Sequence, residues 1–249
     1  MKRADVWGVV KVVVAILVVW QLLAMALRIP FIPTPIAVLV NIYHIFFAKI
    51  ALHLLMSLTR IFAGLAASIL IGLPLGLCMG YFPAWNKRLS PLVYFTYPVP
   101  KIALLPLVML IFGIGELSKI FMILMIVVFQ IIVSMRDAVA GIPKETFYAM
   151  TSLGARRRDV FGTVVFPASL PALLSSVRVS LGTALSVLFF TETFGTQYGL
   201  GYFIMDSWMR VNYVDMFSGI LILSVLGLLL FGLVDLLEHM LCRWRTGVQ

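Results

Sequence analysis

Charged residues are scarce in this sequence of 249 residues, since Asp, Glu, Lys and Arg together make up only 12% of it. Soluble domains are about one quarter charged and about half apolar. Here 62% of the residues are hydrophobic, and the mean hydropathy is +1.09. A single water-soluble core of this size cannot hide that much apolar surface. The composition therefore excludes an ordinary soluble enzyme and favours a protein whose solvent is a lipid bilayer.

Cysteine is nearly absent as well, and so are the motifs of common enzymes. Cys78 and Cys242 are the only two cysteines, so the chain has neither a disulfide framework nor a Cys-x-x-Cys metal site. His44 and His53 are not on one close helical face, which gives little support to a metal site. No phosphate loop, Gly-x-Ser-x-Gly elbow or His-Glu-x-x-His helix occurs. We predict no catalytic residue, metal or cofactor in this chain.

The few charges are mostly basic, with 19 Lys and Arg against 10 Asp and Glu. Nucleic-acid-binding proteins share such a balance, but the positive-inside bias of membrane proteins explains it here. With the amino terminus inside, 12 basic residues fall in inside connections, 4 in outside connections and 3 in or near spans. We therefore expect no nucleic-acid partner and predict that both termini are cytoplasmic.

Six apolar segments approach the length of about 20 residues that a membrane-spanning helix needs. Their ranges are 9–27, 57–80, 92–112, 119–136, 171–192 and 216–240. The first segment imitates a secretory signal, but no cleavage site precedes a polar mature region, so we interpret it as a retained helix. The sequence predicts an all-α, multi-pass membrane protein with one transmembrane domain over residues 1–249.

The connection before the second segment contains a further helical pattern. Residues 36–55 mix aromatic side chains with polar ones such as Asn41 and Lys49. This mixture is typical of an amphipathic helix at the membrane interface. A segment that faces a partner protein is the alternative.

The longest polar segment runs from Arg136 to Pro171 and is also helical in pattern. Pro143 suits the first turn of a helix, and Leu153-Gly154 predicts that this helix ends on a left-handed glycine. A second short helix is predicted from Arg157 to Phe166, ended by Pro167.

The first of these short helices has apolar residues on one face, namely Phe147, Met150 and Leu153. A loop that only sets membrane topology needs a few charges and no apolar stripe. The stripe therefore indicates a docking surface for another protein.

This loop resembles the cytoplasmic EAA motif of bacterial ABC importer permeases, which reads Glu-Ala-Ala, three residues, Gly, nine residues, Ile-x-Leu-Pro. The matching positions are Ala149, Gly154, Val164, Phe166 and Pro167. The sequence departs from the motif at Tyr148, in place of Glu, and at Met150, in place of the second Ala. Glu145, one turn earlier, either supplies an acidic contact to the ATPase or only caps its helix.

The ATPase-coupling residues that the resemblance implies are Glu145, Tyr148, Ala149, Met150, Leu153, Gly154, Ala155 and Pro167. Four further tracts resemble the nitrate, sulfonate and taurine branch of these permeases. They lie at 98–106, 112–119, 152–155 and 199–202. Permeases for thiamine-precursor pyrimidines and riboflavin are similar to this branch, so the substrate stays open.

The resemblance implies a permease subunit in the bacterial inner membrane that moves a small solute by alternating access. The solute would be an anion such as nitrate, sulfonate or taurine, or a vitamin precursor. The implied partners are a second permease copy, two ATPase subunits that bind ATP and Mg²⁺, an extracytoplasmic binding protein, and membrane lipid. The alternative is a self-sufficient carrier or channel, which should show midplane carboxylates and symmetric halves.

Charged residues inside a membrane are costly and mark candidates for a translocation path. Glu192, within Thr191-Glu192-Thr193, either forms the outer end of such a path or is an interfacial carboxylate that pairs with Arg210. Tyr97 is a further candidate for this path, and so is Lys101, which follows it in the proline-broken third segment. Lys101 either attracts an anion or snorkels toward the interface, and we prefer snorkelling.

Arg60 and Arg178 each lie in a Ser-x-x-Arg-x-x-x-Gly pattern. Small residues at helical spacing let helices approach closely. We therefore interpret both patterns as helix packing.

Overall fold

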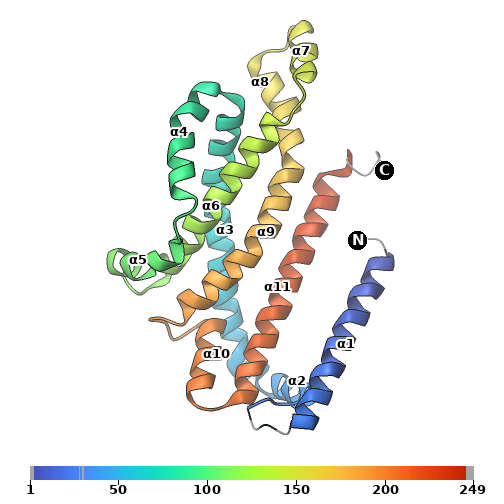
Figure 1. Cartoon of the computed structure of the whole chain (residues 1–249), viewed down its shortest axis with the longest axis vertical. Coiled ribbons are helices and arrows are strands. Elements are labelled where there is room, and N and C mark those ends of the chain that lie inside the picture. The colour runs from blue at the N-terminus through green and yellow to red at the C-terminus, as the bar shows by residue number, and fades with distance from the viewer. Residues whose placement is uncertain (1–2, 28, 30, 245–249) are drawn as a thin grey trace. The chain divides into compact units, whose positions relative to one another are not determined.

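A computed structural model describes residues 3–27, 29 and 31–244. The regular structure of these residues is entirely helical (Figure 1), which confirms the all-α prediction. Contacts divide the chain into two compact units, the first made of Met1–Thr59 with Phe189–Leu228 and the second of Arg60–Leu188 with Leu229–Gln249. The helices that pass from one unit to the other are α3 (Ala51–Tyr81), α9 (Phe166–Glu192) and α11 (Tyr213–Leu241).

Four helices in the described part of the chain are long and apolar enough to cross a membrane, or five if a bent pair forms one span. The four are Pro35–Tyr81, Glu116–Ala140, Arg157–Glu192 and Tyr213–Leu241. The bent pair joins Pro83–Thr96 to Lys101–Phe112 at 79°. The predicted segment 9–27 forms part of α1 (Arg3–Leu27), whose apolar stretch Lys11–Leu27 is shorter than these spans.

The second predicted segment begins much earlier in the structure than in the sequence pattern. Helix α2 (Pro35–Ile45) continues through a π-helical segment, Phe46–Ile50, into α3. Pro35 opens α2 with its fixed φ, and the Thr34 side chain accepts a hydrogen bond from the Ala37 N–H at 3.3 Å. The expected boundary between an interfacial helix at 36–55 and a span at 57–80 is therefore wrong.

The polar residues that made 36–55 look amphipathic have partners inside the first unit. Asn41 Nδ2 donates to Asp215 Oδ1 at 2.8 Å and to Ser218 Oγ at 3.0 Å. Lys49 Nζ forms an ion pair with Asp215 at 3.3 Å. These contacts join α2 and the π segment to α11, so the polarity reflects internal pairing.

The third predicted segment is broken where its prolines lie. Helix α4 (Pro83–Thr96) is separated by Pro98 and Pro100 from a 3₁₀ turn, Lys101–Leu104, and then α5 (Leu105–Phe112). Proline removes a backbone donor and clashes with the preceding turn, which explains a break at this point. The 79° bend follows this break (Figure 1).

Helix α6 (Glu116–Ala140) packs closely on α3 in the second unit because α3 carries a small residue at every fourth position. The residues of this small-residue stripe are Gly64, Ser68, Gly72, Gly76 and Gly80. A Cβ added at Gly76 would lie 2.6 Å from Met135 Cβ, and one at Gly80 would lie 2.5 Å from Val139 Cβ. Larger residues on this stripe would force the two helices apart.

Both arginines that we interpreted as packing residues also form ion pairs in the second unit. Arg60 is almost fully buried, and its Nε and Nη2 each donate to the Glu116 carboxylate at 2.6 Å. Arg178 on α9 pairs with Asp235 and Glu238 on α11. The two-pronged contact of Arg60 with Glu116 fixes helix orientation more strictly than apolar packing alone.

A short helix, α10 (Leu200–Met209), lies between the fifth and sixth predicted segments, where an outside connection was expected. Its 10 residues are too few to span a bilayer. It packs on α11, where the space beside Gly219 is filled by Ile204 and Phe203.

Candidate functional site

The loop that resembles the EAA motif folds as expected around Gly154. Helix α7 (Lys144–Ser152) follows Pro143, which lies one position before the first helical turn rather than within it. Gly154 has a φ of +74°, and the Ala155 N–H donates to the Met150 carbonyl at 3.1 Å. This is a left-handed glycine termination, as the sequence predicted.

The predicted apolar stripe of α7 is divided between two environments. The Phe147 ring lies 6.2 Å from the ring of Tyr81 at the end of α3, and Tyr81 in turn lies 6.1 Å from Phe161. Leu153 is 83% exposed and Tyr148 is 66% exposed. Phe147 thus anchors the loop while its neighbours are free to contact a partner. We call the exposed residues Glu145, Tyr148, Ala149, Ser152 and Leu153 the α7 face.

The second short helix does not stop at Pro167, and this prediction is wrong. Helix α8 (Arg157–Val160) continues through a π segment, Phe161–Val165, directly into α9. A π segment widens the helix at the turn just before Pro167, where a proline ring would otherwise clash. Pro167 is therefore accommodated near the start of α9, and the loop leads into one continuous helix, Arg157–Glu192.

Two of the path candidates, Tyr97 and Lys101, line an open cavity of about 400 Å³ in the second unit. The Lys101 side chain is buried, and Nζ donates to the carbonyls of Thr96 and Tyr97 at 2.9 and 3.0 Å. These carbonyls lie where α4 ends and its helical hydrogen bonds stop. Nζ also lies 4.9 Å from the centre of the Phe129 ring. Lys101 folds back to cap the broken helix rather than extending outward, so the snorkelling interpretation does not describe it.

The other path candidates lie in the first unit, where Glu192 closes α9. Glu192 is fully buried and accepts hydrogen bonds from Ser57 Oγ at 2.8 and 2.9 Å and from the Gly201 N–H at 2.8 Å. Ser57 Oγ accepts from the Leu200 N–H at 2.8 Å, and His53 Nδ1 accepts from the Gly199 N–H at 3.1 Å. Three consecutive N–H groups at the start of α10 are thus bound. We call His53, Ser57 and Glu192 the α10 clamp.

The two flanking threonines take different positions beside the α10 clamp. Thr191 is fully buried with Glu192, whereas Thr193 Oγ1 donates to the Phe190 carbonyl at 2.7 Å. Arg210 pairs with Asp206, one turn earlier on its own helix, at 2.8 Å. A buried Glu192 does not fit the alternative of an interfacial carboxylate.

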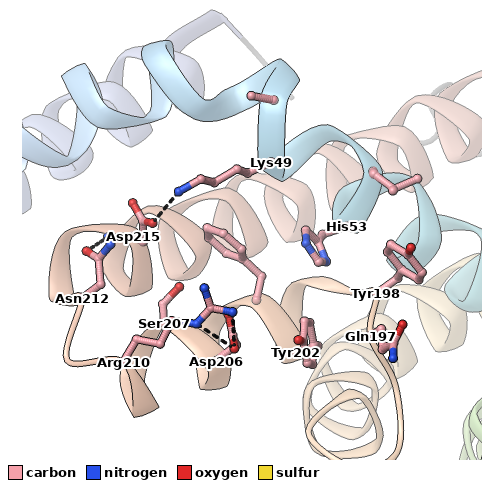
Figure 2. A pocket seen from close by; sticks show the side chains of 13 residues that line it. Lys49, His53, Gln197, Tyr198, Tyr202, Asp206, Ser207, Arg210, Asn212 and Asp215 are labelled. Carbon is pink, nitrogen blue, oxygen red and sulfur yellow. Dashed lines mark hydrogen bonds and ion pairs between the residues drawn. The ribbon is translucent and has the colours of Figure 1, made fainter.

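Figure 2 shows a second open cavity, of about 420 Å³, beside the α10 clamp. The ring of His53 is stacked 5.8 Å from that of Tyr202 on one side of it. The Lys49–Asp215 and Asp206–Arg210 ion pairs lie in its wall (Figure 2). This cavity could not be inferred from the sequence, because its residues come from two segments that lie more than 140 positions apart.

Comparisons with known proteins agree with the resemblance in the sequence. Residues 68–241 match the family described as "binding-protein-dependent transport system inner membrane component". The taurine transport system permease protein TauC of Escherichia coli (strain K12) is 34% identical over 79% of this chain and 72% of its own. The formylaminopyrimidine transport permease protein ThiX of Halalkalibacterium halodurans is 30% identical over 92% of this chain and 92% of its own.

The fold is also found among solved structures. A chain from the inward-facing MetNI methionine ABC transporter superposes with a TM-score of 0.67 at 21% identity. The match covers 76% of this chain and 94% of that one.

Proposed function

Because the chain belongs to the family of binding-protein-dependent transport system inner membrane components, we propose that it moves a small solute across the membrane by alternating access. It is a multi-pass permease subunit of an ABC transporter and is not itself catalytic. ATP is hydrolysed on its ATPase partner, where we expect ATP and Mg²⁺ to bind. We further propose that two copies of residues 1–249, each a single permease domain, form the path, and that an extracytoplasmic binding protein delivers the solute.

We assign ATPase docking to the α7 face. The observation that carries this proposal is a short helix with exposed Tyr148 and Leu153, anchored from behind by the Phe147–Tyr81 contact. The loop leads into the continuous helix Arg157–Glu192, so a displacement of the loop is passed to a membrane span. The π segment Phe161–Val165 is a natural hinge. Such coupling requires that the ATPase contact the loop differently in its two states.

We propose that the translocation path includes the cavity of Tyr97 and Lys101 in the second unit. Thr191, Glu192 and Thr193 remain separate path candidates within the first unit. The names of the two relatives are those of taurine and formylaminopyrimidine permeases. A small anion or a vitamin precursor is therefore the proposed class of solute.

We also propose that α1 is a sixth span. Its 25 residues correspond to a length of about 37 Å, which exceeds the bilayer core of about 30 Å. Its apolar side chains are largely exposed, among them Val12, Ile16, Val19 and Leu22. Six spans with the positive-inside bias leave both termini in the cytoplasm.

The orientation of the α7 face is tested by labelling single cysteines in a chain whose Cys78 and Cys242 are replaced by Ala. We expect Arg157→Cys to react with impermeant maleimide only from the cytoplasm, and Gln197→Cys only from outside. Both positions are exposed, so each thiol is within reach of the reagent. Gln249, the corresponding position for the carboxyl terminus, lies outside the described residues. Labelling of Arg157→Cys from outside would contradict both the topology and the docking proposal.

A further inference from the structure

Gln130, on α6, gives the cavity of Tyr97 and Lys101 a fixed hydrogen-bond donor. The fully buried Ser180 hydroxyl on α9 donates to Gln130 Oε1 at 2.6 Å. A side-chain amide has one oxygen acceptor and one NH₂ group. Because Ser180 occupies the oxygen, the NH₂ group is left on the side of Thr183, whose Oγ1 is 3.5 Å away. Gln130 and Thr183 both line the cavity.

The hydrogen bonds that these donors already make are weak. The contact of 3.5 Å from Gln130 Nε2 to Thr183 is at the outer limit for a hydrogen bond. The Thr183 hydroxyl donates to the Val179 carbonyl on its own helix at 3.4 Å, which is also long. Both groups can redirect their hydrogens to a bound solute at little cost.

The only charge in the wall of this cavity, among the described residues, is the positive charge of Lys101. Lys101 lies in the wall, and two of the three N–H bonds of its ammonium group are directed to the Thr96 and Tyr97 carbonyls. None of the described residues that line the cavity is acidic. A cation in a poorly solvated wall without a neighbouring carboxylate attracts an anion more strongly than it would in water.

We propose that this cavity binds a small oxyanion, such as a sulfonate, with Gln130 and Thr183 as hydrogen-bond donors and Lys101 as the attracting charge. The proposal rests on the proposed transport function, because it makes the cavity the place where the solute is held during passage. It favours an anionic solute over a neutral pyrimidine, which would need acceptors as well as donors at the same wall.

The test uses Ser186→Cys, a cavity position that leaves all three proposed groups intact. The full-length chain, free of its two native cysteines, is assembled with its ATPase in lipid nanodiscs. Its thiol is reacted separately with 2-sulfonatoethyl and 2-(trimethylammonium)ethyl methanethiosulfonate, which are similar in size and opposite in charge. The ratio of the two rates is divided by the same ratio for 2-mercaptoethanol in solution.

We expect the normalised ratio to favour the sulfonate reagent by about tenfold or more. Lys101→Met should remove most of this preference, and Gln130→Leu should reduce it without affecting the cationic reagent. Lys101→Arg should keep it, and Ile126→Val, which alters an apolar residue of the same cavity, serves as the matched control.

A ratio at or below that of the free thiol would overturn the proposal, and so would a preference that survives both Lys101→Met and Gln130→Leu. Failure of both reagents to react would overturn it too, because the cavity would then be closed to solutes. The measurement requires no transport. A chain that carried no solute would therefore contradict the proposed function while leaving the anion preference of the cavity measurable.

Discussion

Glu192→Ala is expected to destabilise the protein more than any other single loss of a carboxylate in the first unit. The substitution leaves the Ser57 hydroxyl and the Gly201 N–H without the acceptor that Glu192 provides. Each buried donor without a partner costs about 1–3 kcal/mol. We therefore expect a loss of about 2–6 kcal/mol in the free energy of unfolding, measured as a lower midpoint of thermal unfolding in detergent, together with a loss of solute uptake.

Asp206→Ala is the matched control for this prediction. Asp206 is also a carboxylate of the first unit, but its partner Arg210 is 70% exposed and lies one helical turn away. Exposed pairs of this kind contribute about 0–1 kcal/mol. Glu192→Gln should fall between the two, because it retains an oxygen acceptor. Equal effects of Glu192→Ala and Asp206→Ala would show that the α10 clamp does not stabilise the unit.

Gly154→Val is expected to impair transport while leaving membrane insertion normal. No atom lies within 4 Å of a Cβ built at Gly154, so a side chain meets no steric obstacle and its cost arises from the φ of +74°. That backbone conformation costs a residue with a Cβ about 1–2 kcal/mol. The cost corresponds to a decrease of roughly 5- to 30-fold in the population of the native turn. We expect normal abundance in the membrane, with weaker co-purification of the ATPase and slower ATP-dependent uptake.

Gly154→Asn provides the control, because asparagine tolerates the left-handed region better than valine. It should retain most of the uptake. If Gly154→Val and Gly154→Asn both transport at the wild-type rate, the geometry of this turn is not required for coupling.

The features that the sequence predicted correctly are local ones. The left-handed Gly154 followed from the residues around one helix end, and the apolar segments followed from length and hydropathy alone. The close packing of α3 on α6 also had a signal that could have been used, since Gly72, Gly76 and Gly80 recur at every fourth position. Helix boundaries were predicted less accurately. The π segment before Pro167, for example, allows a helix to continue where a proline usually ends it.

The features that the sequence could not give depend on residues far apart in the chain. Ser57 and Glu192 are 135 positions apart, and Asn41 and Asp215 are 174 apart. The polar residues of the segment 36–55 indicated a membrane interface, because their partners on a distant helix could not be recognised in the sequence. In the same way, the capping role of Lys101 depends on the path of the broken segment and not on its own surroundings in the sequence.

Photo-crosslinking from the α7 face in living cells tests most directly whether this loop binds the ATPase. Leu153 is replaced by the photoreactive amino acid p-benzoylphenylalanine, and Leu110 on α5, which is also 83% exposed, is replaced in a control chain. We expect Leu153 to crosslink to a protein whose peptides include a Gly-x-x-x-x-Gly-Lys-[Ser/Thr] phosphate loop, and we expect no such adduct from Leu110. An absence of such an adduct from Leu153, or equal adducts from both positions, would contradict the assignment of this loop to the ATPase.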